Sequence, residues 1–190
     1  MDLTSEEALL LIEKYKTKEN EQIINHSICV ANCASKIADA LNLDIDKVKT
    51  LGYIHDIGKL IDITKEHSIC GYEFLKKIGY KEDYANICLT HSYLNNDYFC
   101  IAGEIPKDIE FRTNFIKNHK YTIYEKIINI SDLMSTTKIL TLDKRLIELM
   151  LRKGIFENTL YHVKESYKLK QYFDDLLGFN LYNLFDNIEI

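Results

Sequence analysis

Apolar residues recur at helical spacing along almost the whole chain. After His26, the apolar positions Cys29, Val30, Cys33, Ile37 and Ala40 are separated by three or four residues. Side chains at this spacing share one face of an α-helix. Comparable patterns predict helices that begin at Thr4 or Ser5 and that cover residues 19–41, 44–55, 64–79, 82–92, 108–119, 123–137, 142–152 and 159–177. We therefore expect an all-α, single-domain helical bundle over residues 1–190, with the C-terminal helices of 140–190 packed on it.

The helical pattern loosens over one long stretch, residues 93–106. Long irregular segments within compact domains are often functional. We expect this segment to form a lid over a binding site.

The composition agrees with a folded helical domain and argues against a broad nucleic-acid-binding surface. Hydrophobic residues make up 46% of the 190 positions. One Pro and seven Gly are too few turn-forming residues for many strands and hairpins. The net charge of -5 argues against a broad nucleic-acid footprint, which needs a basic surface. A small phosphorylated substrate remains compatible, because a local metal ion or lysine outweighs the mean charge.

The five cysteines indicate a reducing compartment. They are scattered, odd in number and without CxxC spacing, so we expect small buried hydrophobic residues and a cytoplasmic protein. The first residues, MDLTSEEALLLIEKY, lack the features of a secretion signal. No apolar run approaches the roughly 20 residues that cross a bilayer, so no membrane association is expected.

Six polar side chains interrupt otherwise apolar helical faces: His26, His55, Asp56, His67, His91 and Asp132. His55 and Asp56 are adjacent, and on a helix their side chains diverge by about 100°. Asp132 lies within the largely apolar segment IINISDLMS. An isolated carboxylate in a hydrophobic core is too costly to keep charged. A shared metal centre accounts for all six residues together.

The sequence also predicts the surroundings of three residues outside this set. Gly71 follows His67 by one turn and is expected to leave space near a ligand. His119 and His162 lie among polar and charged neighbours, and we expect both to be solvated.

The donor set indicates the metal. Imidazoles and carboxylates suit Fe, Mn, Zn or Ni better than Ca. Six protein ligands exceed the three or four that one catalytic ion usually takes, which favours two divalent ions with a bridging carboxylate. Fe or Mn is favoured, with Zn, Ni or Mg as alternatives.

These residues resemble a known family. The order of His26, then His55-Asp56, then Asp132 resembles the HD superfamily of metal-dependent phosphohydrolases. The stretch HDIGK matches its signature, also found in HD-GYP phosphodiesterases, and EKIINISDLMS resembles the helix that supplies the last Asp. The resemblance covers about residues 20–137 and is strongest to stand-alone HD proteins of low-GC bacteria.

His67 and His91 resemble the two extra histidines of the dinuclear branch. His91 is followed by Ser92, and no GYP motif comes after it. His67 also follows the HD pair after a shorter loop than in YqeK-like hydrolases. The substrates of HD-GYP and YqeK-like proteins therefore do not carry over.

The resemblance implies a role for each residue. The first ion would be held by His26, His55, Asp56 and Asp132, and the second by His67 and His91, with Asp56 bridging. Asp56 and Lys59 are the expected catalytic residues, because Lys59 lies one turn after His55 and can reach a phosphate oxygen. Arg112, Ser135 and Thr136 are further candidates for substrate binding. The expected substrate is a small phosphorylated molecule, with a nucleotide favoured.

Two other classes stay open at this point. Some HD-fold proteins use a di-iron pair with the same kinds of ligands to oxidise a substrate with dioxygen. A non-catalytic regulatory module that keeps the metal for stability is the other alternative. The sequence leaves the oligomeric state open.

Overall fold

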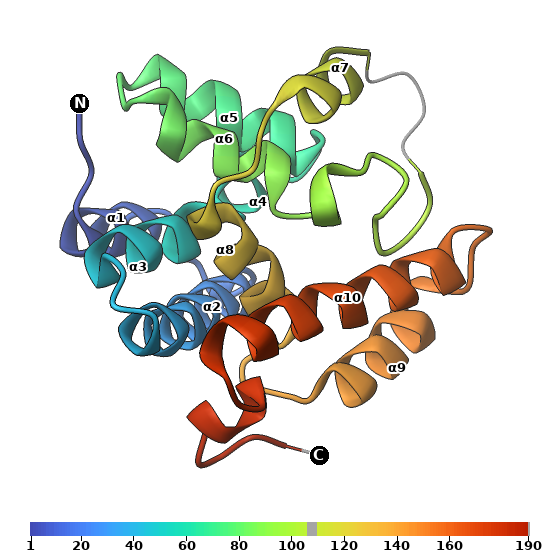
Figure 1. Cartoon of the computed structure of the whole chain (residues 1–190). Coiled ribbons are helices and arrows are strands. Elements are labelled where there is room, and N and C mark those ends of the chain that lie inside the picture. Colours follow the sequence, from blue (N-terminus) through green and yellow to red (C-terminus); the bar gives the residue numbers. More distant parts are fainter. Residues whose placement is uncertain (106–109, 190) are drawn as a thin grey trace.

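The computed structural model describes residues 1–105 and 110–189, and within them the fold is all-α, as predicted (Figure 1). The described residues form no β-strand, only the isolated bridges Ser135–Ile139 and Leu140–Glu189. The α-helices are α1 (Ser5–Glu13), α2 (Glu21–Ala40), α3 (Ile45–Ile54), α4 (Gly58–Ile61), α5 (His67–Lys77), α6 (Glu82–Thr90), α7 (Glu110–Asn118), α8 (Ile123–Leu133), α9 (Leu142–Lys153) and α10 (Thr159–Leu177). Short 3-10 helices follow at η1 (Leu94–Asn96) and η2 (Leu181–Leu184).

Side-chain caps fix several helix starts. Thr4 and Glu7 form a reciprocal capping box at α1, and Thr122 and Glu125 form another at α8. Asp44 accepts a hydrogen bond from the first turn of α3. Such caps satisfy amide groups that lack a partner within the helix. The predicted starts at Thr4 and Asp44 are confirmed.

Other boundaries differ from the prediction. The helix predicted from residue 64 starts only at His67, because the Glu66 side chain caps it by accepting a hydrogen bond from the Ile69 amide. The short helix α4 is not predicted. α8 ends at Leu133, four residues early. Pro106 and Asp108, the ends of two predicted segments, lie outside the described residues.

The core lies around α8. This helix packs against α2, α3 and α10, and Figure 1 shows it in the middle of the molecule. Ile127, Ile128 and Ile130 of α8 are fully buried. The C-terminal part joins the same core, because Leu169 and Phe173 of α10 belong to it.

Two glycines allow the helices that carry the candidate site to approach closely. A Cβ on Gly58 would lie 1.9 Å from the carbonyl oxygen of His67, and one on Gly71 would lie 2.9 Å from Cys88 Sγ. Gly71 therefore lets α5 pack against α4 and α6. The expectation that it leaves space for a ligand is wrong.

All five cysteines are free and buried, as predicted. Among the described residues, no helix has both the length and the hydropathy to cross a bilayer.

Candidate metal centre

All six predicted ligands come together, from five places in the bundle. His26 lies on α2, His55 ends α3, and Asp56 follows it in the turn before α4. His67 opens α5, His91 ends α6, and Asp132 lies on the last turn of α8. His55 and Asp56 both face this centre although they are adjacent, and the turn between α3 and α4 that carries them keeps right-handed helical dihedral angles at His55 and Ile57.

Asp56 lies between two pairs of histidines. One of its carboxylate oxygens, Oδ2, is 3.9 Å from His26 Nε2 and 3.6 Å from His55 Nε2. The other, Oδ1, is 3.4 Å from the Nε2 atoms of both His67 and His91. Each oxygen thus faces its own pair, and either group of three is compact enough to hold a metal ion.

Asp132 completes the first group. Its Oδ1 lies 3.1 Å from His26 Nε2 and 4.0 Å from His55 Nε2. The first group therefore offers two imidazoles and two carboxylates, whereas the second offers two imidazoles and the shared Asp56.

Backbone carbonyls orient three of the four imidazoles. The Nδ1 atoms of His26, His55 and His91 lie 3.1, 2.7 and 3.1 Å from the carbonyl oxygens of Thr136, Gly52 and Ile87. Nδ1 must donate the proton in these bonds, which leaves the Nε2 lone pair directed at the centre. Histidine ligands of metal ions are commonly fixed in this way.

Two buried polar atoms indicate whether this set of residues suits a cation. His55 Nε2 and Asp56 Oδ1 are buried and have no hydrogen-bond partner among the described residues. Leaving such groups unsatisfied is costly. A divalent ion between the imidazoles and carboxylates would satisfy both atoms, so the donor set fits a metal site.

The charge states suit the same role. Burial lowers the pKa of His55 to about 4, and burial likewise lowers that of His67 to about 4, so both are neutral ligands at pH 7. Burial alone would raise the pKa of Asp56, but positive charge nearby, chiefly that of Lys59, outweighs burial and holds that pKa well below its usual range. Burial is likewise outweighed at Asp132 and His26, because their contact lowers the pKa of the carboxyl and raises that of the imidazole. A cation that binds at His26 Nε2 would therefore have to displace a proton from it.

The centre opens into a cavity of about 680 Å³. Five of the six candidate ligands line it; His55 lies behind them. Leu94 and the run Ile101–Glu104, from the predicted lid, also line the cavity. This run is tied to α10, because the Asn158 side chain donates hydrogen bonds to the carbonyls of Phe99 and Ile101. The segment forms part of the cavity wall.

Lys59 lies at the cavity and on a candidate ligand. Its Nζ is 2.5 Å from Asp56 Oδ2, and 40% of its side chain is exposed. It therefore reaches both the carboxylate and the space where a substrate would bind.

Arg112 also lines the cavity, but it is buried and held by partners. Its Nη1 is 2.8 Å from Glu66 Oε1, and its Nη2 donates a hydrogen bond to the Tyr93 hydroxyl. Glu66 caps α5 and lies 3.5 Å from His67 Nδ1. Arg112 and Glu66 thus fix the position of His67. Glu66 was not among the predicted residues, although it directly precedes His67 in the sequence.

Ser135 and Thr136 lie differently from each other. Thr136 lines the cavity, and its carbonyl oxygen accepts the hydrogen bond from His26. Ser135 is fully buried and is not among the residues that line the cavity. Because α8 ends at Leu133, the helical spacing that placed Ser135 beside Asp132 does not continue that far.

The expectation of solvated histidines at positions 119 and 162 is wrong. His119 Nε2 lies 2.7 Å from Glu125 Oε1, and its ring stacks on Phe115. His162 is only 4% exposed and lines the cavity. Its sequence neighbours are polar, but Leu169 and Phe173, seven and eleven residues on, share its buried face, and this periodicity would have revealed it.

Three cations of α9 form a part of the cavity wall that was not predicted from the sequence. Arg145, Arg152 and Lys153 all line the cavity. Arg152 and Lys153 follow Arg145 by seven and eight residues, which places the three on one helix face. This spacing is the feature of the sequence that predicts a cationic face on α9.

Comparison with known proteins agrees with this geometry. Residues 23–137 match the family model described as HD domain. The match covers more than half of the chain, so the chain belongs to the HD domain family. The resemblance found in the sequence is thereby confirmed at the level of the superfamily.

The curated relatives are similar over a shorter stretch. Ribonuclease Y of Thermotoga maritima is 41% identical over 80 residues, which is 41% of this chain and 16% of that protein. Ribonuclease Y of Fusobacterium nucleatum is 39% identical over 80 residues, with the same coverage. This chain thus aligns with about a sixth of the length of these relatives.

A solved structure matches over nearly the whole chain. The HD domain of the Listeria monocytogenes phosphodiesterase PgpH, in complex with cyclic-di-AMP, is 23% identical, with a TM-score of 0.50. The match covers 95% of this chain and 97% of that one. At this identity the likeness establishes the fold, including the C-terminal helices.

Proposed function

We propose that this protein is a metal-dependent phosphohydrolase that cleaves a phosphomonoester or phosphodiester of nucleotide type with a metal-activated water. The observation that carries the proposal is the position of Asp56 between two histidine pairs at the wall of a cavity. Membership of the HD family supports it.

The distances support the proposed metal-binding roles. His26, His55, Asp56 and Asp132 are proposed to hold the first ion, and Asp56, His67 and His91 the second. Fe or Mn is favoured, with Zn, Ni or Mg as alternatives. Bound divalent ions at such a centre acidify a water molecule and stabilise negative charge on phosphate oxygens.

The remaining residues act on the substrate and on the ligands. Lys59 supplies a mobile positive charge beside the centre, suited to a phosphate oxygen. Arg112, through Glu66, keeps His67 in place. Thr136 positions His26 through its backbone carbonyl.

The size of the cavity supports a nucleotide-sized substrate. At about 680 Å³ it falls within the range of pockets that enclose a whole small molecule. Similar proteins point the same way: Ribonuclease Y is named for RNA cleavage, and the PgpH domain binds cyclic-di-AMP. We accordingly propose a small nucleotide as the substrate and include RNA among the compounds to test.

The test begins with metal analysis of protein purified without oxygen. The metal-loaded protein is then assayed with p-nitrophenyl phosphate, bis(p-nitrophenyl) phosphate, cyclic-di-AMP and a short single-stranded RNA. We expect hydrolysis of at least one compound, and its loss in Asp56→Asn. Fully loaded protein that hydrolyses none of them would overturn the proposal. Dioxygen uptake with an organic substrate would instead indicate an oxygenase.

A further inference from the structure

The cavity has a second chemically distinct wall, built by α9. Arg145, Arg152 and Lys153 line it together with one carboxylate of the same helix, Glu148. Three cations against one anion leave this wall with a net positive charge. None of the four belongs to the part of the chain that matches the HD family model.

Glu148 connects the two guanidinium groups. Arg145 Nη1 contacts Glu148 Oε2, and Arg152 Nε lies 2.6 Å from Glu148 Oε1. One carboxylate cannot neutralise two guanidinium groups, and each keeps N–H donors that Glu148 does not use. Arg145 is 7% exposed, and its buried Nε has no hydrogen-bond partner among the described residues.

Lys153 is held at the same wall by the backbone of the opposite segment. Its Nζ donates a hydrogen bond of 2.9 Å to the carbonyl oxygen of Ala102. Gly103 lies directly against its side chain, since a Cβ there would be 3.5 Å from Lys153 Cδ. Lys153 is exposed as a whole, but partial desolvation of its ammonium group lowers its pKa, while the charge of Asp132 acts in the opposite direction. The ammonium group therefore lies within electrostatic range of Asp132.

We propose that Arg145, Arg152 and Lys153 form a second anion subsite, so that the preferred substrate carries a second phosphate group besides the one that is cleaved at the His/Asp centre. Guanidinium groups pair with phosphate through two parallel hydrogen bonds, and an ammonium adds a point charge. Arg152, whose side chain is 54% exposed, lies at the open edge, and Arg145 lies deeper. The reaction at the other end rests on the proposed function, whereas the binding of a phosphate at this wall does not.

The test compares two dinucleotides that differ by one phosphate. ApA has only the phosphate of its linkage, and pApA has an additional 5′-phosphate. Phosphorothioate-linked forms, which resist hydrolysis, are used for binding to the metal-loaded protein by equilibrium dialysis. We expect wild type to bind pApA at least about tenfold more tightly than ApA, the scale of one charge-assisted pair.

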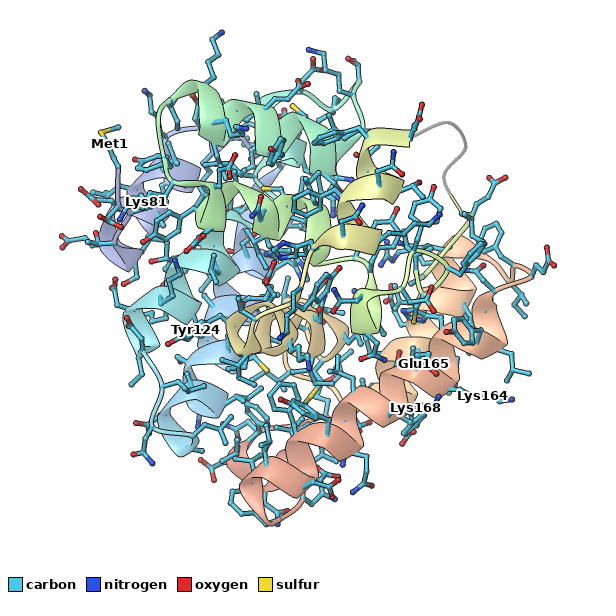
Figure 2. All side chains as sticks on the ribbon, turned by 45° about the horizontal axis from the view of Figure 1, so that its top comes forward. Met1, Lys81, Tyr124, Lys164, Glu165 and Lys168 are labelled. Atoms are coloured by element: carbon cyan, nitrogen blue, oxygen red, sulfur yellow. The ribbon has the colours of Figure 1, made fainter. Side chains whose placement is uncertain are left out.

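The variant Arg152→Gln/Lys153→Gln removes two cations from the exposed part of the wall and leaves the buried Arg145 in place. We expect it to lose the preference for pApA while its affinity for ApA stays unchanged. Lys164→Gln is the control for a lysine-to-glutamine change away from the cavity: it removes one cation from the neighbouring helix α10, where Figure 2 shows Lys164 at the outer edge of the molecule. The control should keep the full preference.

Equal binding of the two dinucleotides by wild type, or an equal loss for both in the double variant, would overturn the second subsite. Turnover of the unmodified dinucleotides separates this result from the proposed function. A preference for pApA without hydrolysis of any phosphoester would refute the phosphohydrolase and leave the subsite. Hydrolysis of ApA and pApA, together with equal binding of the two, would refute the second subsite and leave the phosphohydrolase.

Discussion

The two oxygens of the Asp56 carboxylate have different partners, and this makes Asp56 the most informative residue to change. Oδ2 faces His26 and His55, and Oδ1 faces His67 and His91. Asp56→Asn keeps the shape and removes the charge, so we expect both proposed ions to be lost, with affinities reduced by more than the roughly 10²-fold typical of losing an outer-shell partner. Metal titration followed by elemental analysis measures this.

His91→Ala serves as the comparison for Asp56. His91 faces Oδ1 of Asp56, on the side of the second group, so its loss should weaken the second ion and spare most of the first. An equal loss of both ions from the two variants would argue against a bridging carboxylate.

Lys59 gives the second prediction at this scale. Lys59→Ala should lower turnover by about 10²-fold, the effect of losing one electrostatic donor to the developing charge, with metal content unchanged. Lys59→Met, which keeps most of the aliphatic stem, should behave like the alanine variant. Because Lys59 Nζ also lies on Asp56 Oδ2, a parallel fall in metal content would show that the lysine acts through Asp56 and not on the substrate.

The candidate ligands that interrupt an apolar helix face were predictable from the sequence. The groups that hold these side chains in position were not, because they lie far away in the chain. His26, His67 and His91 interrupt apolar faces, and the structure brings them together with the other three candidates. The partner of Arg112, Glu66, lies 46 positions away in the chain, and no periodicity connects the two. The same is true of the Thr136 carbonyl, which holds His26 across 110 positions.

Among the helices, the junction of α4 and α5 determines where His67 lies. A methyl group on Gly58 would come within 1.9 Å of the His67 carbonyl, which forces the start of α5 away. We expect Gly58→Ala to destabilise the protein by about 1–3 kcal/mol, as overpacking does, and to weaken the second metal ion by displacing His67. Urea unfolding and metal titration measure the two effects.

Gly178→Ala is the control for that change. Nothing lies within 4 Å of a Cβ at this position, although its φ of 76° disfavours alanine. We expect it to cost about 1 kcal/mol of stability and to leave metal binding intact. Weakened metal binding in both variants would attribute the effect to general destabilisation.

The predictability of the helices depended on their length. The long amphipathic helices α2 and α10 were predicted within about two residues of their observed bounds. α4 has only four residues, too few to show a helical period. α8 was predicted too long because a tight turn, closed by the bridge between Ser135 and Ile139, follows its end, and this turn contains no Gly or Pro that would reveal it in the sequence.

At the scale of the whole molecule, the cavity is closed by elements that are far apart in the sequence. Its lining runs from Gln22 on α2 to His162 on α10. The HD signature predicted the metal end from local motifs. The end formed by α9 and α10 depends on how α10 packs against both the η1 segment and α9, and the contact with the distant η1 segment leaves no pattern in a single sequence.

His162 on the α10 side of the cavity gives a prediction for the stability of the entire fold. Burial, reinforced by the charge of Lys153, lowers its pKa to about 4, from an ordinary value of 6.5. The unfolded chain therefore binds a proton at this position as the pH falls below 6.5, while the folded chain stays neutral until about pH 4. Stability linked to His162 is fully present above pH 6.5 and is lost progressively between pH 6.5 and 4.

For such a shift, the free energy of unfolding should fall by about 2 kcal/mol between pH 7 and pH 5 because of His162 alone. His162→Gln cannot take up this proton, so its unfolding free energy should fall by that much less over the same interval. Urea unfolding at the two pH values, with a chelator present throughout so that proton-linked release of metal does not contribute, measures the difference. The other histidines and the carboxylates are common to both proteins and cancel. If wild type and His162→Gln lost equal stability between pH 7 and pH 5, His162 would have to be protonated in the fold, and its ring would then face water or a carboxylate and not the closed wall of the cavity.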